Sequence, residues 1–410
     1  MDDLRLAWKN LWRNRRRTLI TLAAIAVSIT LMQAAHNLSF GVYASMIDRG
    51  VRAGSGHLSI YRQGYLQDRD PKLGFNPQNL AAEISRLAGV ESVLPRLYLP
   101  GLAQSSRDSR GILLTGTAPV EEYRINPFLR KLPATQMIRE GNLRDALVGQ
   151  RLFEELKLSF GGKFVVTLQG QEGELASELL RVRGIFTSGI KDIDRSLVLV
   201  DQHRAATMRG RPQQIHELAI ILKPQADERW LLDQIGRLLK NHPQLILVGW
   251  QEAVANLADA IRLDYAAQKF IFLIIILIVT IGVINTLLMS VMERIPEFGV
   301  ILALGAPSWR LQRMLLTEAL LLGVIGMLLG SFGGSLATWY LRIEGLDLRY
   351  FVSSSLEFGG VVFDPIMRAD WDLRWMLKMA FYVCGLALLA AWYPARKAGK
   401  ISPAGAMRHY

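Results

Sequence analysis

The sequence predicts an α+β membrane protein: four transmembrane helices, with a large extracytoplasmic α+β domain inserted between the first and the second. Three observations lead to this fold class. Half of the 410 residues are hydrophobic, and many of them gather in four long apolar runs. Short strand-like and helical patterns alternate between the first two runs. Basic residues are concentrated in the short segments on one side of the runs.

The four runs have the length and composition of membrane spans, because a helix needs about 20 apolar residues to cross the ~30 Å hydrocarbon core. Phe270–Met292 contains no charged residue, and Met314–Leu341 contains only Glu318, in its first turn. Thr18–Ala35 is also free of charge, and Met376–Tyr393 is shorter. The predicted spans are residues 18–40, 267–292, 311–341 and 373–394.

Charge orients these spans, since short cytoplasmic segments carry an excess of Lys and Arg. Segments 1–17, 293–313 and 395–410 together hold 13 Lys and Arg against four acidic residues, whereas loop 342–372 has three arginines against six acidic residues. Both termini and the 293–310 loop are therefore predicted to be cytoplasmic, with residues 41–266 outside. This topology accounts for the net charge of +12 without nucleic-acid binding.

The first run also resembles a cleavable signal peptide, with a basic flank and small residues at Ala34 and Ala35. An uncleaved signal-anchor is favoured, because cleavage would leave an odd number of spans. The single cysteine, Cys384, falls in the fourth span. An intrachain disulfide and a cysteine metal site are therefore excluded, and packing alone must hold the large domain together.

Within the large domain, short extended runs bounded by turn residues predict strands. These are His57–Tyr61, Gly111–Gly116, Phe164–Leu168, Leu179–Phe186, Ser196–Val200, Glu217–Leu222 and Leu245–Val248. Helices are predicted over Ala146–Leu158 and Pro224–Leu239, and a junction of two lobes near Lys131–Arg144. His36–Val51 and Asn256–Lys269 continue the adjoining spans as helices, either as stalks or as ordinary domain helices.

A short helix with clear end signals is predicted between the second and third spans. Pro296 suits its first position, and Glu297 lies beside the positive helix N-terminus. Gly305 can adopt the left-handed conformation that ends helices, and Pro307 prevents continuation. Such a helix could transmit force from a soluble partner, although an ordinary capped hairpin explains the pattern equally well.

The third span carries a stripe of glycines that permits close approach of another helix. At 3.6 residues per turn, the stripe occupies roughly one third of the helix circumference. Packing within the chain and a dimer contact explain it equally well. Its members are Gly323, Gly326, Gly330, Gly333 and Gly334.

Motifs of common catalytic chemistry are absent from the sequence. Gly161-Gly162-Lys163 lacks the spacing of a phosphate-binding loop, and neither H-E-x-x-H nor G-x-S-x-G occurs. The six histidines are scattered. Asn285 and Glu318 lack the charged companions of a proton pathway. The sequence therefore predicts neither an enzyme nor a proton-coupled carrier, and no cofactor or metal bound by this chain.

Several motifs together resemble FtsX-like and MacB-like ABC transporter permeases. Glu293–Ala306 is similar to their E-R…E-x-G-x-x-x-A-x-G-A signature, although Ile295 and Pro296 replace the usual basic or polar residues. Three further segments are similar, in order, to the basic approach to their first span, their extracytoplasmic core domain and their C-terminal ending. These are Leu6–Leu19, Ala146–Gly189 and Tyr393–Ala404.

In that family, the loop helix is a coupling helix that docks on a separate ATPase subunit, which holds ATP and Mg. The resemblance implies two ATPases with two permease chains, identical or related, in the bacterial inner membrane. The implied coupling residues are Glu293, Arg294, Glu297, Phe298, Gly299, Ala303, Leu304 and Gly305.

Among the branches of this family, four spans with one large outer domain and no fused ATPase look most like the lipoprotein-releasing permeases. The implied function is mechanotransmission that releases a lipoprotein or another amphiphile from the membrane. The alternative is a signalling permease that activates an extracytoplasmic enzyme. An apolar groove continuous with the membrane would favour release, and a polar protein-docking face would favour signalling.

Overall fold

The computed structural model describes residues 2–77, 79–139, 142–170, 173–188, 190–210, 213–348, 357–358, 361–362 and 366–400. The chain divides into two compact units. The membrane unit comprises Met1–Tyr43, Leu263–Phe351 and Ile366–Tyr410, and the domain unit comprises Ala44–Arg262 and Val352–Pro365. Two segments quoted for the family resemblance, Ile401–Ala404 and Gly189, lie outside the described residues.

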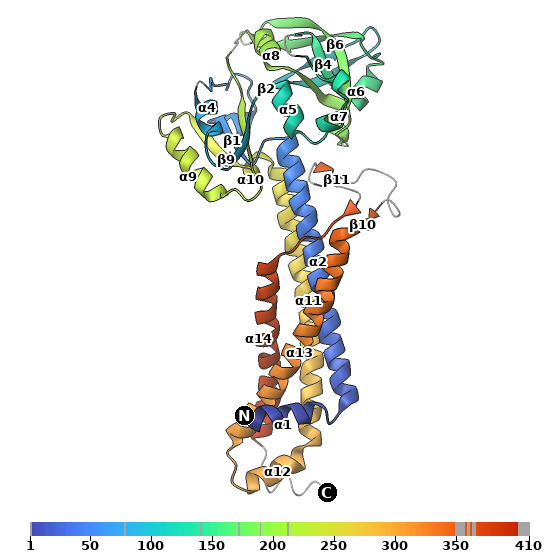
Figure 1. Ribbon diagram of the computed structural model, residues 1–410, viewed down its shortest axis with the longest axis vertical. Helices are drawn as coiled ribbons and strands as arrows, with labels where there is room; N and C mark the ends of the chain where they lie inside the picture. Colours follow the sequence, from blue (N-terminus) through green and yellow to red (C-terminus); the bar gives the residue numbers. More distant parts are fainter. Residues whose placement is uncertain are drawn as a thin grey trace. The chain divides into compact units, whose positions relative to one another are not determined.

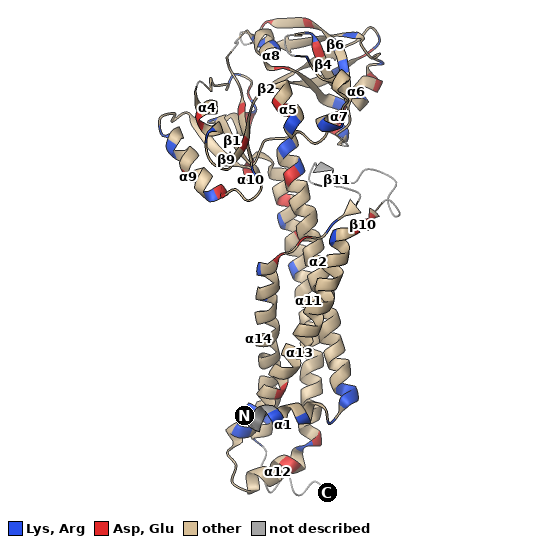
Figure 2. Cartoon of the chain, viewed as in Figure 1, with Lys and Arg blue, Asp and Glu red and all other residues tan. Residues whose placement is uncertain are grey.

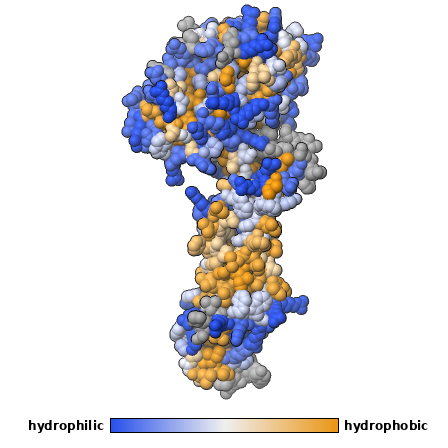
Figure 3. Space-filling model, viewed as in Figure 1, coloured by the Kyte–Doolittle hydropathy of each residue, from blue (hydrophilic) through white to orange (hydrophobic). Residues whose placement is uncertain are grey.

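Four helices in the described part of the chain are long and apolar enough to span a membrane. They are α2 (Arg15–Ala53), α11 (Ala255–Glu293), α13 (Ser308–Ile343) and α14 (Leu373–Gly399) (Figure 1). Their exposed side chains form an apolar band (Figure 3). The four-span prediction is thus confirmed. His36–Val51 and Asn256–Lys269 are helical as predicted, since α2 and α11 each run for 39 residues.

The glycine stripe of α13 faces other helices of the same chain. A Cβ added to Gly326 would lie 2.6 Å from Ile25 Cγ2, and one added to Gly330 would lie 2.6 Å from Ile29 Cβ. The further close approaches are Gly333 to Thr30, Gly334 to Gln33, and Gly323 to Ala387 of α14. In this structure, α2 and α14 therefore occupy the space that the glycines leave.

Side-chain hydrogen bonds accompany the close approach of α2 to α13. Thr30 Oγ1 donates to the backbone carbonyl of Gly330 at 3.0 Å. The other bonds run from Gln33 Nε2 to Ser335 Oγ at 3.2 Å and from Asn37 Nδ2 to Thr338 Oγ1 at 3.0 Å. Lipid gives apolar helices little hydrophobic reason to associate, so small residues and polar pairs stabilise such contacts. The α2–α13 contact uses both.

In the domain unit, six strands close into a barrel. Around the ring they are β2 (Val90–Gln104), β3 (Ser109–Thr117), β7 (Leu197–Asp201), β4 (Asp145–Gly149), β6 (Leu175–Phe186) and β5 (Lys163–Gln169). Alternate strand residues, including Leu97, Leu114 and Phe164, fill its core. Helix α8 (Gln202–Arg209) contributes Ala205 and Ala206 to the same core.

Strand β2 continues into a second lobe. There it pairs with β8 (Glu217–Leu222), which is followed across the sheet by β1 (Leu58–Arg62) and β9 (Leu245–Gly249). Helices α4 (Leu80–Ser85) and α9 (Glu228–Leu239) pack Ile84 and Ile235 into this lobe's core. The mixed α+β domain is confirmed.

Two details of the domain differ from the sequence analysis. The junction expected near Lys131–Arg144 is wrong, because Ile138 from that segment packs on Phe186 of the barrel. The lobes share β2 instead. The helix predicted over Ala146–Leu158 is strand β4 followed by the short helix α6 (Gln150–Glu155). Pairing of β4 with β6 and β7 outweighs the helical spacing of its apolar residues.

A buried charged network lies where the lobes meet. Arg96 Nη2 donates to Glu122 Oε1 at 2.8 Å, and Arg96 Nη1 lies 3.9 Å from Glu217 Oε2. The hydroxyls of Tyr61 and Tyr98 donate to the Glu217 carboxylate. Because each charge is compensated by a charged or hydrogen-bonding partner, the network can be buried without an isolated ion.

His216, beside this network, predicts a pH dependence of domain stability. Its Nε2 donates to the Pro71 carbonyl at 2.7 Å, and its Nδ1 accepts the Tyr98 N–H at 3.1 Å. Burial lowers the pKa of His216 to about 4. In the unfolded chain the pKa of a histidine is near 6.5. Between pH 6.5 and pH 4 the unfolded state therefore binds more protons than the folded state, so the free energy of unfolding decreases as the pH falls. The expected loss is about 3 kcal/mol.

The measurement is pulse proteolysis of the full chain in urea across that pH range. His216→Asn should flatten the pH dependence, because asparagine keeps an acceptor but does not titrate. His203→Asn is the matched control at an exposed histidine. An equal slope in the wild type and His216→Asn would refute the assignment.

Candidate functional site

The predicted loop helix is present between α11 and α13 as α12 (Ile295–Ala303). Arg294 is its N-cap, so Pro296 occupies the second helical position, one later than expected. Proline is tolerated there because the first N–H groups of a helix have no partner within it. Glu297 lies in the first turn, as predicted.

The other end of α12 is closed by a Schellman motif. Gly305 has a φ of +85°, the left-handed conformation expected from the sequence. Its N–H donates to the Leu302 carbonyl at 3.0 Å, and the Ala306 N–H donates to the Ile301 carbonyl at 3.2 Å. These two bonds satisfy carbonyls that would otherwise be left over at the helix end.

Arg294 connects α12 to α13 inside the protein. Its Nη1 donates to Glu318 Oε1 at 3.1 Å, and these two side chains are only 10% and 3% exposed. Its Nε lies 3.4 Å from Glu297 Oε2, and its guanidinium lies over the ring of Phe298 at 5.1 Å. We call the Arg294–Glu318 pair the brace. Removing Arg294 would leave the buried Glu318 carboxylate without its charged partner.

Two arginines from the N-terminal segment bind the acidic residues of the loop. Arg13 Nη1 lies 2.5 Å from Glu297 Oε1, and Arg17 Nη2 lies 2.5 Å from Glu293 Oε1. The hydrogen bond from Arg17 is the main cause that lowers the pKa of Glu293. The pKa of Glu297 is also lowered; burial opposes ionisation, but Arg13 and Arg294 outweigh it.

These outer pairs differ from the brace in their exposure to solvent. Glu293 and Glu297 are 42% and 41% exposed, and Arg13 is 61% exposed. Water and salt therefore screen these pairs, and each contributes at most ~1 kcal/mol. The loop is thus held by one buried pair and two weaker outer pairs.

The outward face of α12 is apolar. Val300, Ile301 and Leu304 are 52%, 36% and 83% exposed, and an orange patch marks this region in Figure 3. Of the sequence-predicted coupling residues, Ala303, Leu304 and Gly305 are exposed here, whereas Arg294, Phe298 and Gly299 are buried against the chain itself. Val300 and Ile301 were missed, although their spacing from Leu304 places all three near one helix face.

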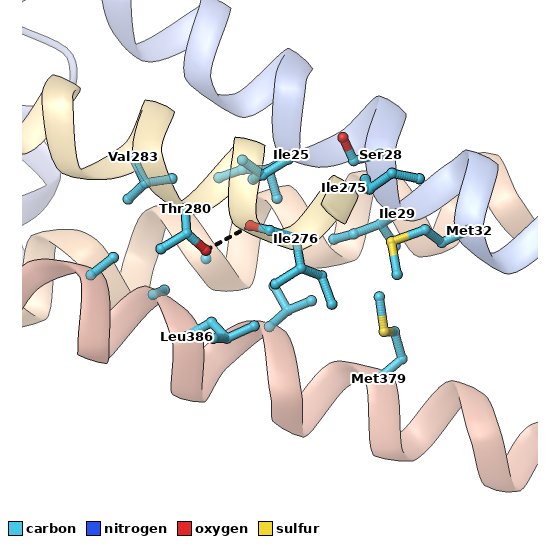
Figure 4. Close-up of a pocket in the computed structure, with 15 residues that line it drawn as sticks. Ile25, Ser28, Ile29, Met32, Ile275, Ile276, Thr280, Val283, Met379 and Leu386 are labelled. Atoms are coloured by element: carbon cyan, nitrogen blue, oxygen red, sulfur yellow. Dashed lines mark hydrogen bonds between the residues drawn. The ribbon is translucent and has the colours of Figure 1, made fainter. Parts of the chain in front are cut away.

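A narrow apolar cavity of about 50 Å³ lies among the four membrane helices (Figure 4). Ile29 and Met32 of α2, Ile276 of α11 and Met379 of α14 point toward it. Its described lining includes the hydroxyls of Ser28 and Thr280, and Thr280 donates to the Ile276 carbonyl within its own helix. The lining therefore suits hydrocarbon rather than a hydrophilic solute.

Among the side chains that the structure describes, no three His, Cys, Asp or Glu residues lie close enough together to hold a metal ion. The chemically distinctive parts of the molecule are therefore the loop that carries α12, the brace and the apolar cavity.

The sequence is similar to known permeases over most of its length. Residues 269–403 match the model of the FtsX-like permease C-terminal domain. The chain is 22% identical to the lipoprotein-releasing system transmembrane protein LolC of Neisseria meningitidis, over 96% of this chain and 94% of that protein. It is 23% identical to the pyoverdine export ATP-binding/permease protein PvdT of Pseudomonas putida, over 99% of this chain and 59% of that protein.

Among solved structures, the periplasmic region of MacB from Actinobacillus actinomycetemcomitans aligns with a TM-score of 0.37 and 12% identity, over 50% of this chain and 93% of that one. The assignment rests on the sequence matches and the four spans. The chain therefore carries an FtsX-like permease C-terminal domain over residues 269–403, and it is a multi-pass protein of the bacterial inner membrane that is similar to LolC and LolE over most of its length.

Proposed function

We propose that this chain couples ATP hydrolysis on a separate subunit to work outside the membrane, releasing a lipoprotein or another amphiphile. The observation that carries the proposal is the construction of α12. Its exposed apolar face offers a docking surface, and the brace joins the same short helix to α13 at 3.1 Å. A push on α12 would therefore move α13 rather than bend a loose loop.

The packing of the membrane unit suggests how this movement would continue. The glycine stripe brings α13 against α2, and the hydrogen bond from Thr30 to Gly330 ties the two helices. α2 supplies residues to both the membrane unit and the domain unit, as does α11. In the proposed assembly, two permease chains, identical or related, work with two ATPase subunits that hold ATP and Mg.

The proposed cargo follows from the apolar character of the membrane unit. The cavity of Figure 4 is lined mainly by aliphatic side chains, which would stabilise an acyl chain by roughly 0.8 kcal/mol for each buried CH₂. At about 50 Å³ it is narrow, so helix movement would have to widen it for a whole chain. The full-length similarity to a lipoprotein-releasing protein supports the same cargo class.

Photocrosslinking in intact membranes tests this cargo. A photoreactive residue at Met32 or Ile276 should capture a lipid-modified protein, and ATP should reset the capture. Leu273, which is 62% exposed on α11 and is not part of the cavity lining, is the matched control. Equal capture at Leu273 would contradict a specific site. Capture of only a soluble hydrolase would favour the signalling alternative.

A second prediction concerns ATP. The purified chain should neither bind nor hydrolyse it, because the sequence contains no phosphate-binding loop. With its partner ATPase, Leu304→Asp should reduce coupled hydrolysis by an order of magnitude or more, since it places a charge in the apolar docking face. Leu175→Asp, at a leucine that is 77% exposed in the domain unit, is the control. Stoichiometric nucleotide binding by the isolated permease would refute the proposal that ATP is bound and hydrolysed on a separate subunit.

Topology gives a third test. In a Cys384→Ser background, Leu175→Cys, at a leucine that is 77% exposed in the domain unit, should react with a membrane-impermeant maleimide in intact spheroplasts. Ala303→Cys, in the exposed part of α12, should react only after the inner membrane is opened. The expectation follows from the excess of Lys and Arg in segments 1–17 and 293–313. The reverse pattern would invert the proposed orientation.

A further inference from the structure

We propose that α1 (Asp2–Leu11) and the basic segment after it bind the anionic cytoplasmic leaflet, where lipid headgroups compete with Glu293 and Glu297 for Arg17 and Arg13. Lipid composition would then set how tightly the loop that carries α12 is held. The functional importance of this loop rests on the proposed function. Lipid binding by α1, and the competition of lipid with Glu293 and Glu297, can be measured without assuming that function.

Helix α1 is attached to the membrane unit by one narrow face. Ala7 and Leu11, one turn apart, are 0% and 6% exposed. Leu11 joins the apolar cluster that includes Leu322 of α13, and Asn10 Nδ2 donates to Met314 Sδ at 3.8 Å. α1 therefore lies across the end of the helix bundle rather than along it (Figure 1). A helix across the end of a membrane bundle lies roughly parallel to the bilayer surface.

Three large apolar side chains on α1 and just after it are exposed. Leu6, Trp8 and Trp12 are 47%, 48% and 36% exposed. The two tryptophan rings meet edge to face, with their centroids 5.9 Å apart. Tryptophan favours the bilayer interface, where its ring contacts lipid and its N–H reaches water. The exposed pair therefore matches a helix that lies in the headgroup layer.

The charge around these tryptophans identifies the kind of lipid. The segment carries the basic residues Arg5, Lys9, Arg13, Arg15, Arg16 and Arg17 (Figure 2). Arg5, Lys9, Arg15 and Arg16 are exposed. Basic side chains beside interfacial aromatic residues attract anionic headgroups, because the surface of the cytoplasmic leaflet is negative.

The outer ion pairs are suited to exchange with lipid. Arg13 is 61% exposed, and its partner Glu297 is 41% exposed, so water already competes for both. A headgroup phosphate offers an arginine the same charged oxygen acceptors as a carboxylate. The brace, with its exposures of 10% and 3%, is inaccessible to headgroups. Anionic lipid would thus free the outer side of the loop while leaving the brace intact.

The test uses the full chain in nanodiscs, with Cys384→Ser and a spin label at Ala303→Cys on α12. Discs of phosphatidylcholine alone are compared with discs containing one-third phosphatidylglycerol. The ratio of mobile to immobile label should rise about two- to fivefold with the anionic lipid, the range expected for exchange of weak exposed pairs. An unchanged ratio would overturn the proposal.

Two sets of variants separate its steps. Lys9→Gln/Arg15→Gln/Arg16→Gln leaves both outer pairs intact and should lose most of the lipid response. In Glu293→Gln/Glu297→Gln, which lacks both carboxylates, the spin label on α12 should be mobile in either lipid. A full response in the triple variant would overturn the role of the basic surface. Coupled ATPase activity is measured in the same two lipids. If the label responds to anionic lipid as expected but the ATPase activity does not depend on lipid, this inference holds and the proposed role of the loop in coupling is contradicted.

Discussion

Arg294→Met is expected to abolish the coupling of ATP hydrolysis to cargo release and to destabilise the membrane unit. Methionine keeps part of the apolar stem beside Phe298 but leaves the Glu318 carboxylate buried and unpaired. Breaking a buried pair in this way typically costs about 3–5 kcal/mol. The measurements are thermal unfolding in detergent and the ratio of cargo released to ATP consumed by the reconstituted assembly.

The double variant Arg294→Met/Glu318→Leu separates stability from coupling. Replacing both charges by apolar side chains can restore stability, because no buried ion remains. If the brace transmits force, the double variant should unfold near the wild-type temperature and still couple poorly. Full coupling in the double variant would show that α12 moves α13 by packing alone, and the brace would lose its mechanical role.

Gly330→Leu is expected to prevent the normal packing of α2 on α13. A Cβ at this position would lie 2.6 Å from Ile29 Cβ and 2.8 Å from the Ala26 carbonyl oxygen. A backbone oxygen cannot turn aside as the end of a flexible side chain can, so the helices must separate. Overpacking of this kind costs about 1–3 kcal/mol or more, and it would also stretch the Thr30–Gly330 hydrogen bond.

The matched control is Gly282→Leu, in the membrane helix α11, where an added Cβ meets no described atom within 4 Å. Both proteins should be compared by yield of monodisperse chain and by thermal unfolding. We expect a clear loss for Gly330→Leu and little change for Gly282→Leu. Equal stability of the two variants would mean that the α2–α13 contact is not the tight seam described above.

The parts of this protein that the sequence predicts well are governed by local rules. Membrane spans follow from long apolar runs, and the end of α12 follows from Gly305 and Pro307. The partners of the loop residues do not follow from such rules, because Arg13 and Glu297 lie 284 positions apart along the chain. The signature residues therefore implied contact with an ATPase, whereas the structure places Arg294, Phe298 and Gly299 against the chain's own helices.

Strand β2 shows a second limit of local patterns. It runs for 15 residues, yet Pro95, Pro100 and Gly101 interrupt the alternation that marks a strand. Pro95 and Pro100 remain paired in register with Leu218 and Leu113. Sheet neighbours distant in sequence stabilise a segment that its own composition disfavours, because strand propensity depends strongly on tertiary context.

The shared strand also imposes an order of assembly during synthesis and export. Every strand of the barrel lies between Val90 and Asp201, so the barrel can close as soon as that stretch has crossed the membrane. β1 is delivered earlier, but it must wait for β8 and β9, which end at Gly249. Since chains fold in units as they emerge, the inserted barrel should form first and present β2 as the template for the second lobe. The lobe that begins first along the chain would thus be the last to be completed.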